Sequence, residues 1–102
     1  MSLNDIRTML EASGLPVTYR SWPIKEAPPL PFICYLVSYS SNFMADGQVY
    51  YPIDHIQVEL YTRHKDLDAE AAVEAALAMP WQKTEEYIDT EECYQILYEI
   101  EV

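Results

Sequence analysis

Polar and apolar residues alternate strictly along residues 56–63, in the middle of the chain. One set of alternate positions carries Ile56, Val58, Leu60 and Thr62, and the other carries Gln57, Glu59, Tyr61 and Arg63. Successive side chains of a β-strand point to opposite faces of a sheet, and β-branched and aromatic residues favour strands. The pattern therefore predicts a strand with one buried face, and we expect it to be the central strand of the sheet.

A second strand is predicted at 31–39, where residues 32–39 are nearly all apolar or aromatic. Such a run is typical of a strand that is covered on both faces, by helices or by another subunit. The turn-forming pair Asp46-Gly47 lies between this run and the central strand, which we expect to span 48–62. The two strands are therefore predicted to form an antiparallel hairpin.

Two helices are predicted, at 3–12 and 66–78. Ser2 followed by Asp5 resembles a capping box, and the Met79-Pro80 pair ends the second helix. Alanine is the best helix former, and the acidic first turn of the second helix suits the helix dipole. Its inward stripe is expected to consist of Ala69, Val73, Ala76 and Leu77.

Residues 81–88 and 93–102 have the pattern of a further strand pair, joined through 89–92. In the last strand one face is apolar and the other is acidic. The predicted fold class is therefore α+β: one domain over residues 1–102, with an antiparallel sheet of about four strands and two helices packed on it. Its core is expected to include Val58, Leu60, Val73, Leu77, Ile96, Tyr98 and Ile100.

Prolines interrupt the segment that precedes the first core strand, at Pro23, Pro28, Pro29 and Pro31. Proline lacks a backbone N–H and breaks regular structure, so the segment is predicted to be a loop. A proline-stiffened interaction arm is the alternative.

The chain is strongly acidic, with 17 Asp and Glu against 6 Lys and Arg and a formal net charge of -11. This balance disfavours direct nucleic-acid binding, which depends on basic side chains that contact phosphates. Half of the residues are apolar, so the chain is expected to fold and not to behave as an acidic tail. Cys34 and Cys93 are interpreted as two buried reduced thiols in preference to a disulfide, and folding in the cytoplasm is expected, with no membrane span.

No recognisable catalytic or metal-binding motif is present in the sequence. His55 and His64 are nine positions apart on or just past one strand, which places them on opposite faces. The chain has only two glycines and contains no glycine-rich phosphate loop. We therefore expect no enzyme activity, no metal site and no cofactor.

The tip of the first hairpin carries apolar residues among turn formers, a feature that often serves a partner. The residues expected to contact a partner protein are Asn42, Phe43, Met44 and Asp46.

Three stretches together resemble a family of small tail-completion, or head-to-tail joining, proteins of long-tailed bacteriophages and prophages. They are Ala27–Phe32, Val58–Thr62 followed by Lys65-Asp66, and Lys83–Ile88. The resemblance implies a structural α+β subunit at the head-proximal end of the tail that assembles as a ring with tail-tube and connector proteins. It also implies a location in the bacterial host cytoplasm during assembly and in the tail or neck of the virion afterwards.

DNA would pass through such a ring, and carboxylates on its wall would repel the phosphates. We hypothesise that some of the following acids face the lumen: Glu85, Glu86, Asp89, Glu91, Glu92, Glu99 and Glu101. The alternative is that these residues form only a solvated acidic surface. A different alternative for the whole chain is a small acidic regulatory or protein-binding module, such as a DNA mimic that binds a basic partner.

Overall fold

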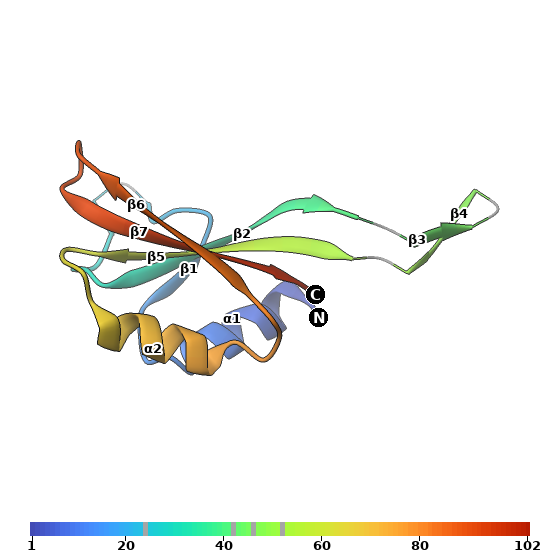
Figure 1. Ribbon diagram of the computed structural model, residues 1–102, viewed down its shortest axis with the longest axis horizontal. Helices are drawn as coiled ribbons and strands as arrows, with labels where there is room; N and C mark the ends of the chain where they lie inside the picture. The colour runs from blue at the N-terminus through green and yellow to red at the C-terminus, as the bar shows by residue number, and fades with distance from the viewer. Residues whose placement is uncertain (24, 42, 46, 52) are drawn as a thin grey trace.

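The computed structural model describes residues 1–23, 25–41, 43–45, 47–51 and 53–102, and for 43–45 and 48–51 it describes the backbone alone. Its elements, shown in Figure 1, are α1 (Leu3–Glu11), β1 (Val17–Tyr19), β2 (Phe32–Ser40), β3 (Phe43–Ala45), β4 (Gln48–Tyr51), β5 (Asp54–Thr62), α2 (Leu67–Ala76), β6 (Gln82–Ile88) and β7 (Cys93–Glu101).

Among the described residues, five strands form the main sheet, in the order β1-β2-β5-β7-β6. The β2-β5, β5-β7 and β6-β7 pairs are antiparallel, as predicted. The prediction of about four antiparallel strands was incomplete, because β1 adds a parallel edge strand in which Val17 pairs with Ile33. Parallel neighbours need a crossover of about a dozen residues, and the proline-rich segment 20–31 supplies it.

α1 begins at Leu3, as the sequence predicts, and α2 begins at Leu67, one residue after its predicted start. Ser2 and Asp5 form a reciprocal capping box: the Asp5 N–H donates to Ser2 Oγ over 3.1 Å, and the Ser2 N–H donates to Asp5 Oδ2 over 2.9 Å. Asp66 caps α2 by accepting a hydrogen bond from the Ala69 N–H at 3.0 Å. α2 ends at Ala76, two residues before the predicted end, because Leu77 already has an extended backbone.

The core lies between the sheet and the two helices, which both cover the same face (Figure 1). The alternation along β5 is confirmed, since Ile56, Val58, Leu60 and Thr62 are buried. All seven predicted core residues are buried as well. Ile6 and Leu10 of α1 pack into this cluster, so that helix covers its own sheet.

β2 is covered on both faces only near its start. Ile33, Cys34 and Tyr35 are buried, whereas Ser38, Tyr39 and Ser40 are exposed. The expectation of a strand covered along its whole length was therefore wrong for this chain alone. The reason is visible in Figure 1, where β2 and β5 extend past the helices.

The predicted single strand at 48–62 is divided between two sheets. β4 ends at Tyr51 and pairs with β3, whereas β5 begins at Asp54 and belongs to the main sheet. Pro52 lies between them in the sequence, and proline has no N–H to donate to a ladder. The β3–β4 hairpin, here called the arm, lies beyond one end of the main sheet, and the molecule measures 49 × 28 × 23 Å (Figure 1).

Candidate functional site

The arm is the part of the backbone that lies farthest from the core. Ala45 pairs with Gln48, and Gly47 between them has a φ of 75°, which suits the predicted turn because glycine adopts positive φ without strain. Phe43 and Met44 belong to β3, but their side chains lie outside the described residues. Asn42 and Asp46 also lie outside the described residues.

The face of the main sheet opposite the helices, here called the open face, carries several acids. Glu59 lies near its middle, in register with Cys34 on one side and Leu97 on the other. Its Oε1 accepts a hydrogen bond from the Tyr61 hydroxyl at 3.1 Å, and Gln95 Nε2 donates to that hydroxyl over 3.0 Å. Burial raises the pKa of Glu59, although the Tyr61 hydrogen bond acts in the opposite direction.

The seven candidate lumen-facing acids lie in three groups. Glu85 and Glu86 are consecutive on β6, so Glu85 points to the helix side, where its Oε1 lies 2.6 Å from Lys65 Nζ. Glu86 points to the open face at the β6–β7 hairpin, whose turn carries Asp89, Glu91 and Glu92. Glu99 and Glu101 lie on the open face at the opposite end of β7. The alternation of a strand could already have separated Glu85 from Glu86.

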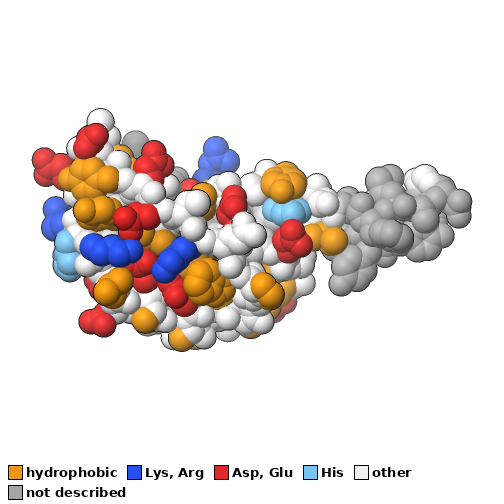
Figure 2. Space-filling model, in the orientation of Figure 1, with side chains coloured by type: hydrophobic (Ala, Val, Ile, Leu, Met, Phe, Trp, Pro, Cys, Tyr) orange, Lys and Arg blue, Asp and Glu red, His pale blue; other side chains and the backbone are white. Residues whose placement is uncertain are grey.

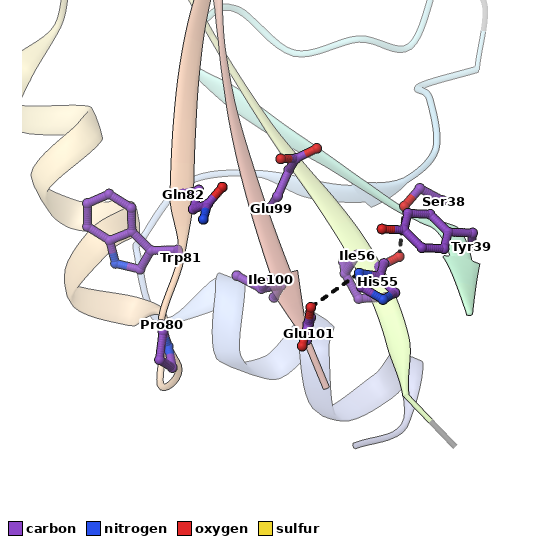
Figure 3. Close-up of a pocket in the computed structure, with 10 residues that line it drawn as sticks. All are labelled: Ser38, Tyr39, His55, Ile56, Pro80, Trp81, Gln82, Glu99, Ile100 and Glu101. Carbon is purple, nitrogen blue, oxygen red and sulfur yellow. Dashed lines mark hydrogen bonds and ion pairs between the residues drawn. The ribbon is translucent and has the colours of Figure 1, made fainter. Parts of the chain in front are cut away.

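A hollow lies at the arm end of the open face and is here called the acidic hollow (Figure 3). Its volume is about 490 Å³, and its lining includes Ser38, Tyr39, His55, Glu99 and Glu101. The His55 ring stacks on Tyr39 with a centroid distance of 4.0 Å, and its Nδ1 lies 3.6 Å from Glu101 Oε1. Ser38 Oγ donates to the His55 carbonyl at 3.0 Å. The ring contacts with Tyr39 and Glu101 position the imidazole near the point where the arm leaves the sheet.

The two histidines do not converge on one site. His55 lies near the start of β5, and His64 lies two residues past its end, with an exposed side chain. No described serine or cysteine nucleophile forms a hydrogen bond with either imidazole. The described lining of the acidic hollow therefore combines an aromatic ring, an imidazole and carboxylates. None of its described nucleophiles forms a hydrogen bond with the imidazole.

A second hollow lies at the other end of the open face, beneath the crossover segment 20–31, and is here called the basic hollow. Its volume is about 590 Å³, and Arg20, Trp22, Phe32, Tyr61 and Arg63 are among its lining residues. The Trp22 and Phe32 rings meet edge to face at 5.8 Å, and Phe32 contacts Tyr61 at 5.5 Å. Sequence analysis missed this site, because its residues come from three segments that are distant in the chain.

Both cysteines line the basic hollow as buried free thiols, as predicted. Burial, with a smaller contribution from Glu59, raises the pKa of the Cys34 thiol to about 11. Burial, together with Glu91, also raises the pKa of Cys93. Since the thiolate is the nucleophilic form, neither thiol is activated for catalysis.

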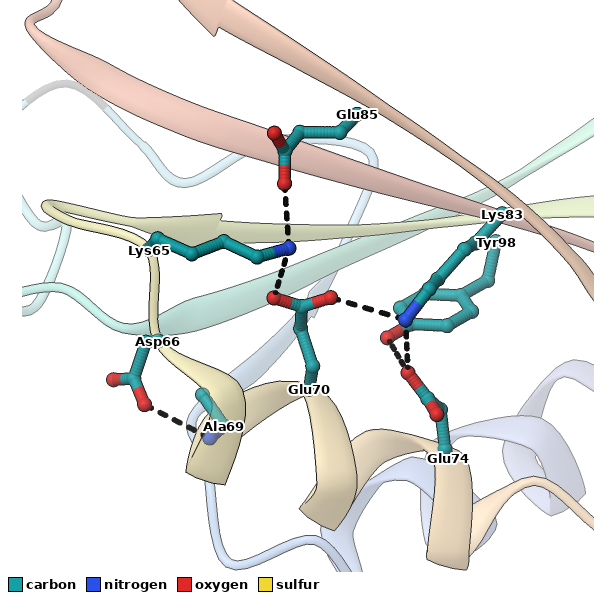
Figure 4. Close-up of polar contacts among 8 residues, drawn as sticks. All are labelled: Lys65, Asp66, Ala69, Glu70, Glu74, Lys83, Glu85 and Tyr98. Atoms are coloured by element: carbon teal, nitrogen blue, oxygen red, sulfur yellow. Dashed lines mark hydrogen bonds and ion pairs between the residues drawn. The ribbon is translucent and has the colours of Figure 1, made fainter.

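A polar network on the helix side centres on Glu70, which belongs to the acidic first turn of α2 (Figure 4). Glu70 is only 3% exposed, and its two oxygens lie 2.7 Å from Lys65 Nζ and 3.1 Å from Lys83 Nζ. Lys83 also contacts Glu74 at 2.8 Å, and the Tyr98 hydroxyl donates to Glu74 at 2.7 Å. Hydrogen bonds to these carboxylates raise the pKa values of both lysines. The network joins α2 to β6 and β7, and we interpret it as structural.

The described residues contain no group of three or more His, Cys, Asp or Glu side chains that could hold a metal ion. Neither described helix is long and apolar enough to cross a membrane. Acidic side chains are spread over the face shown in Figure 2, and Lys and Arg side chains lie among them without forming a broad basic surface. The described part of the chain thus presents two hollows and a projecting arm at its surface.

The fold and site define a small acidic α+β domain with helices on one face of a mixed sheet, an open second face and a projecting arm. No family model, no curated protein and no solved structure was found to match the chain.

Proposed function

We propose that the chain is a structural bacteriophage or prophage protein at the head-proximal end of the tail, in tail completion or head-to-tail joining. In this role it assembles as a ring and contacts tail-tube and connector proteins. It acts in the host cytoplasm during assembly and then in the tail or neck of the virion. The three stretches that resemble tail-completion proteins support the proposal, and the arm is the structural observation that carries it.

The arm has the form expected of an assembly element. A two-stranded hairpin is marginally stable in water by itself, and β3 and β4 pair with each other and not with the main sheet. Its placement beyond the core in Figure 1 leaves it available to another subunit. Contact with a neighbouring subunit would offset the entropy lost on ordering the arm.

The proposal that carboxylates line the opening of the ring rests on the acids of the β6–β7 hairpin. Glu85 is removed from this set because it points to the helix side and pairs with Lys65. Glu99 and Glu101 lie at the opposite end of the sheet, beside the arm. Glu91 lines the basic hollow, so the remaining candidates to face the DNA are Glu86, Asp89 and Glu92. A solvated surface with no role in DNA passage is the alternative.

A triple charge reversal tests the lumen proposal. Glu86, Asp89 and Glu92 are replaced by Lys in the full-length protein. Attraction between the new lysines and phosphates is expected to slow the passage of DNA, so assembled particles should retain or eject DNA abnormally. If the particles assemble and eject DNA normally, the lumen proposal is wrong and these acids form only a solvated surface.

The proposed function has its own test in the genome that encodes the chain. The neighbouring genes are expected to encode head and tail proteins. Deletion of the gene should yield separate heads and tails in electron micrographs of the lysate, and a plasmid copy should restore joined particles. Neighbours unrelated to virions, or normal particles after deletion, would contradict the proposal.

A second candidate function is a small acidic module that binds a basic protein, including a DNA mimic. One observation favours it: Glu59, Glu86, Glu99 and Glu101 all point to the open face. Such a module would bind a basic partner protein as a monomer or small oligomer, and its gene would lie outside a virion gene cluster. The gene neighbourhood and the particle phenotype therefore distinguish the two functions.

A further inference from the structure

The unpaired basic side chains are concentrated at one end of this acidic protein. Three of its six basic residues have ion-pair partners: Arg7 pairs with Glu11, and Lys65 and Lys83 belong to the Glu70 network. Those without an ion pair among the described residues are Arg20, Lys25 and Arg63. Arg20 and Arg63 line the basic hollow, and Lys25 belongs to the crossover segment 20–31, other residues of which contribute to that lining.

The basic hollow has more hydrogen-bond donors than it uses. The indole Nε1 of Trp22 is buried and has no hydrogen-bond partner among the described residues. Arg20 has a φ of 66°, and its N–H donates to the Tyr35 carbonyl over 2.7 Å, which fixes the backbone at the rim of the hollow. Glu91 is the acidic residue in the described lining. Two guanidinium groups and a free indole N–H favour a partner that brings carboxylates.

The opposite end of the open face has the complementary composition. The described lining of the acidic hollow contains Glu99 and Glu101 and neither Lys nor Arg. Glu99 is exposed and forms no ion pair with a described residue, and Tyr39 beside it is 60% exposed. The acidic hollow thus presents two carboxylates and an aromatic ring to solvent.

The two hollows lie at opposite ends of the same strands. His55 lines the acidic hollow and Tyr61 lines the basic hollow, six positions apart on β5, which corresponds to about 20 Å at roughly 3.3 Å per residue. A two-fold contact that placed the same hollow of two copies together would bring like charges into contact. A head-to-tail contact brings opposite charges together and can repeat around a ring.

We propose that the acidic hollow of one copy docks on the basic hollow of a second copy, with Glu99 and Glu101 facing Arg20 and Arg63. The partner is this same chain, because the contact requires two different surfaces and both are present on one molecule with opposite charge. This proposal deepens the ring assembly proposed above and names its subunit contact.

Two complementary charge reversals test the contact in the full-length chain. One variant carries Arg20→Glu with Arg63→Glu, and the other carries Glu99→Arg with Glu101→Arg. Sedimentation velocity at low salt is expected to show concentration-dependent association of the unaltered protein, and association of each variant about tenfold weaker or less, because like charges then meet. An equimolar mixture of the two variants should associate again. Added salt should weaken the association of the unaltered protein.

A matched control changes charge elsewhere by the same amount. Glu11→Arg with Asp68→Arg alters exposed residues of the two helices, on the side away from the hollows, and should leave association within about twofold. Circular dichroism and thermal melting establish that each variant is folded before association is compared.

Four outcomes would overturn the inference. If both reversals associate like the unaltered protein, the ring forms through another surface and the proposed function stands without this contact. A mixture that stays dissociated, or an unaltered protein that remains monomeric at millimolar concentration, would exclude the paired hollows. Binding of a double-stranded DNA oligonucleotide that is lost in the Arg20→Glu, Arg63→Glu variant would assign the basic hollow to phosphates instead.

Discussion

Lys83 on the edge strand β6 contacts the buried carboxylate of Glu70 on α2, with Nζ 3.1 Å from Oε1. We expect Lys83→Met to lower the free energy of unfolding by about 1 to 3 kcal/mol, because Glu70 would keep its burial and lose one of its two cations. Urea denaturation of both proteins measures the difference. Lys25→Met is the control, since Lys25 forms no ion pair with a described residue. Equal effects of the two substitutions would show that the network contributes nothing specific.

The same network predicts a loss of stability in acid. Burial raises the pKa of Glu74, but hydrogen bonds from Lys83 and Tyr98 outweigh it, and the pKa is lowered from 4.5. When folding lowers the pKa of a carboxyl group, the ionised group stabilises the protein at pH values above its unfolded-state pKa. This contribution is lost as the pH falls through its folded-state pKa. Glu74→Gln should therefore reduce the loss of melting temperature between about pH 5 and about pH 3. Glu86 forms no ion pair with a described residue, so Glu86→Gln should leave the dependence of melting temperature on pH unchanged.

Glu59 is expected to change the pH dependence of stability in the direction opposite to that of Glu74. Burial raises the pKa of Glu59 above 4.5, so the folded protein binds the proton more tightly than the unfolded chain does. The stability of the protein therefore falls as the pH rises from the unfolded-state pKa of Glu59 through its folded-state pKa. Glu59→Gln should increase stability at neutral pH by less than about 1 kcal/mol while keeping an acceptor for Tyr61. The gain should disappear below the unfolded pKa. If Glu59→Gln instead lowers stability at neutral pH, the hydrogen bonds of the ionised carboxylate outweigh the cost of its burial.

The register of β5 predicts very different effects for adjacent substitutions. Val58 and Ile100 are 0% and 2% exposed, and an unpaired buried charge costs several kcal/mol against a total stability of about 5 to 15 kcal/mol. Val58→Asp or Ile100→Asp should prevent folding, as judged by circular dichroism. Gln57→Asp, which points to the open face, should fold with a small change in melting temperature. A folded Val58→Asp protein with an unchanged melting temperature would contradict the register.

Substitutions in the arm should separate assembly from folding. Replacing Phe43 and Met44 by Ser should change the free energy of unfolding by less than about 1 kcal/mol, because β3 lies outside the main sheet. Assembly, measured by sedimentation and by the yield of joined particles, should be impaired. If stability falls sharply while assembly persists, the two residues serve the fold of their own chain.

Local patterns in the sequence determined most of the secondary structure. The alternation along 56–62 identified the buried face of β5, and the Ser2 and Asp66 positions identified where the helices begin. These features could be predicted because strand alternation and helix capping depend on residues only two to four positions apart. The same alternation separates Glu85 from Glu86, two of the candidate lumen-facing acids.

Only the tertiary structure decided which distant residues meet. The parallel pairing of β1 with β2 depends on how segment 20–31 crosses the sheet, and composition does not specify that path. Glu70 is buried because Lys65 and Lys83 reach it from outside its helix, which the helical pattern around it does not encode. Arg20 and Arg63 line one hollow although 43 positions separate them in the chain. Contacts of this kind depend on strand order and crossover geometry, whereas alternation and capping are properties of the local backbone.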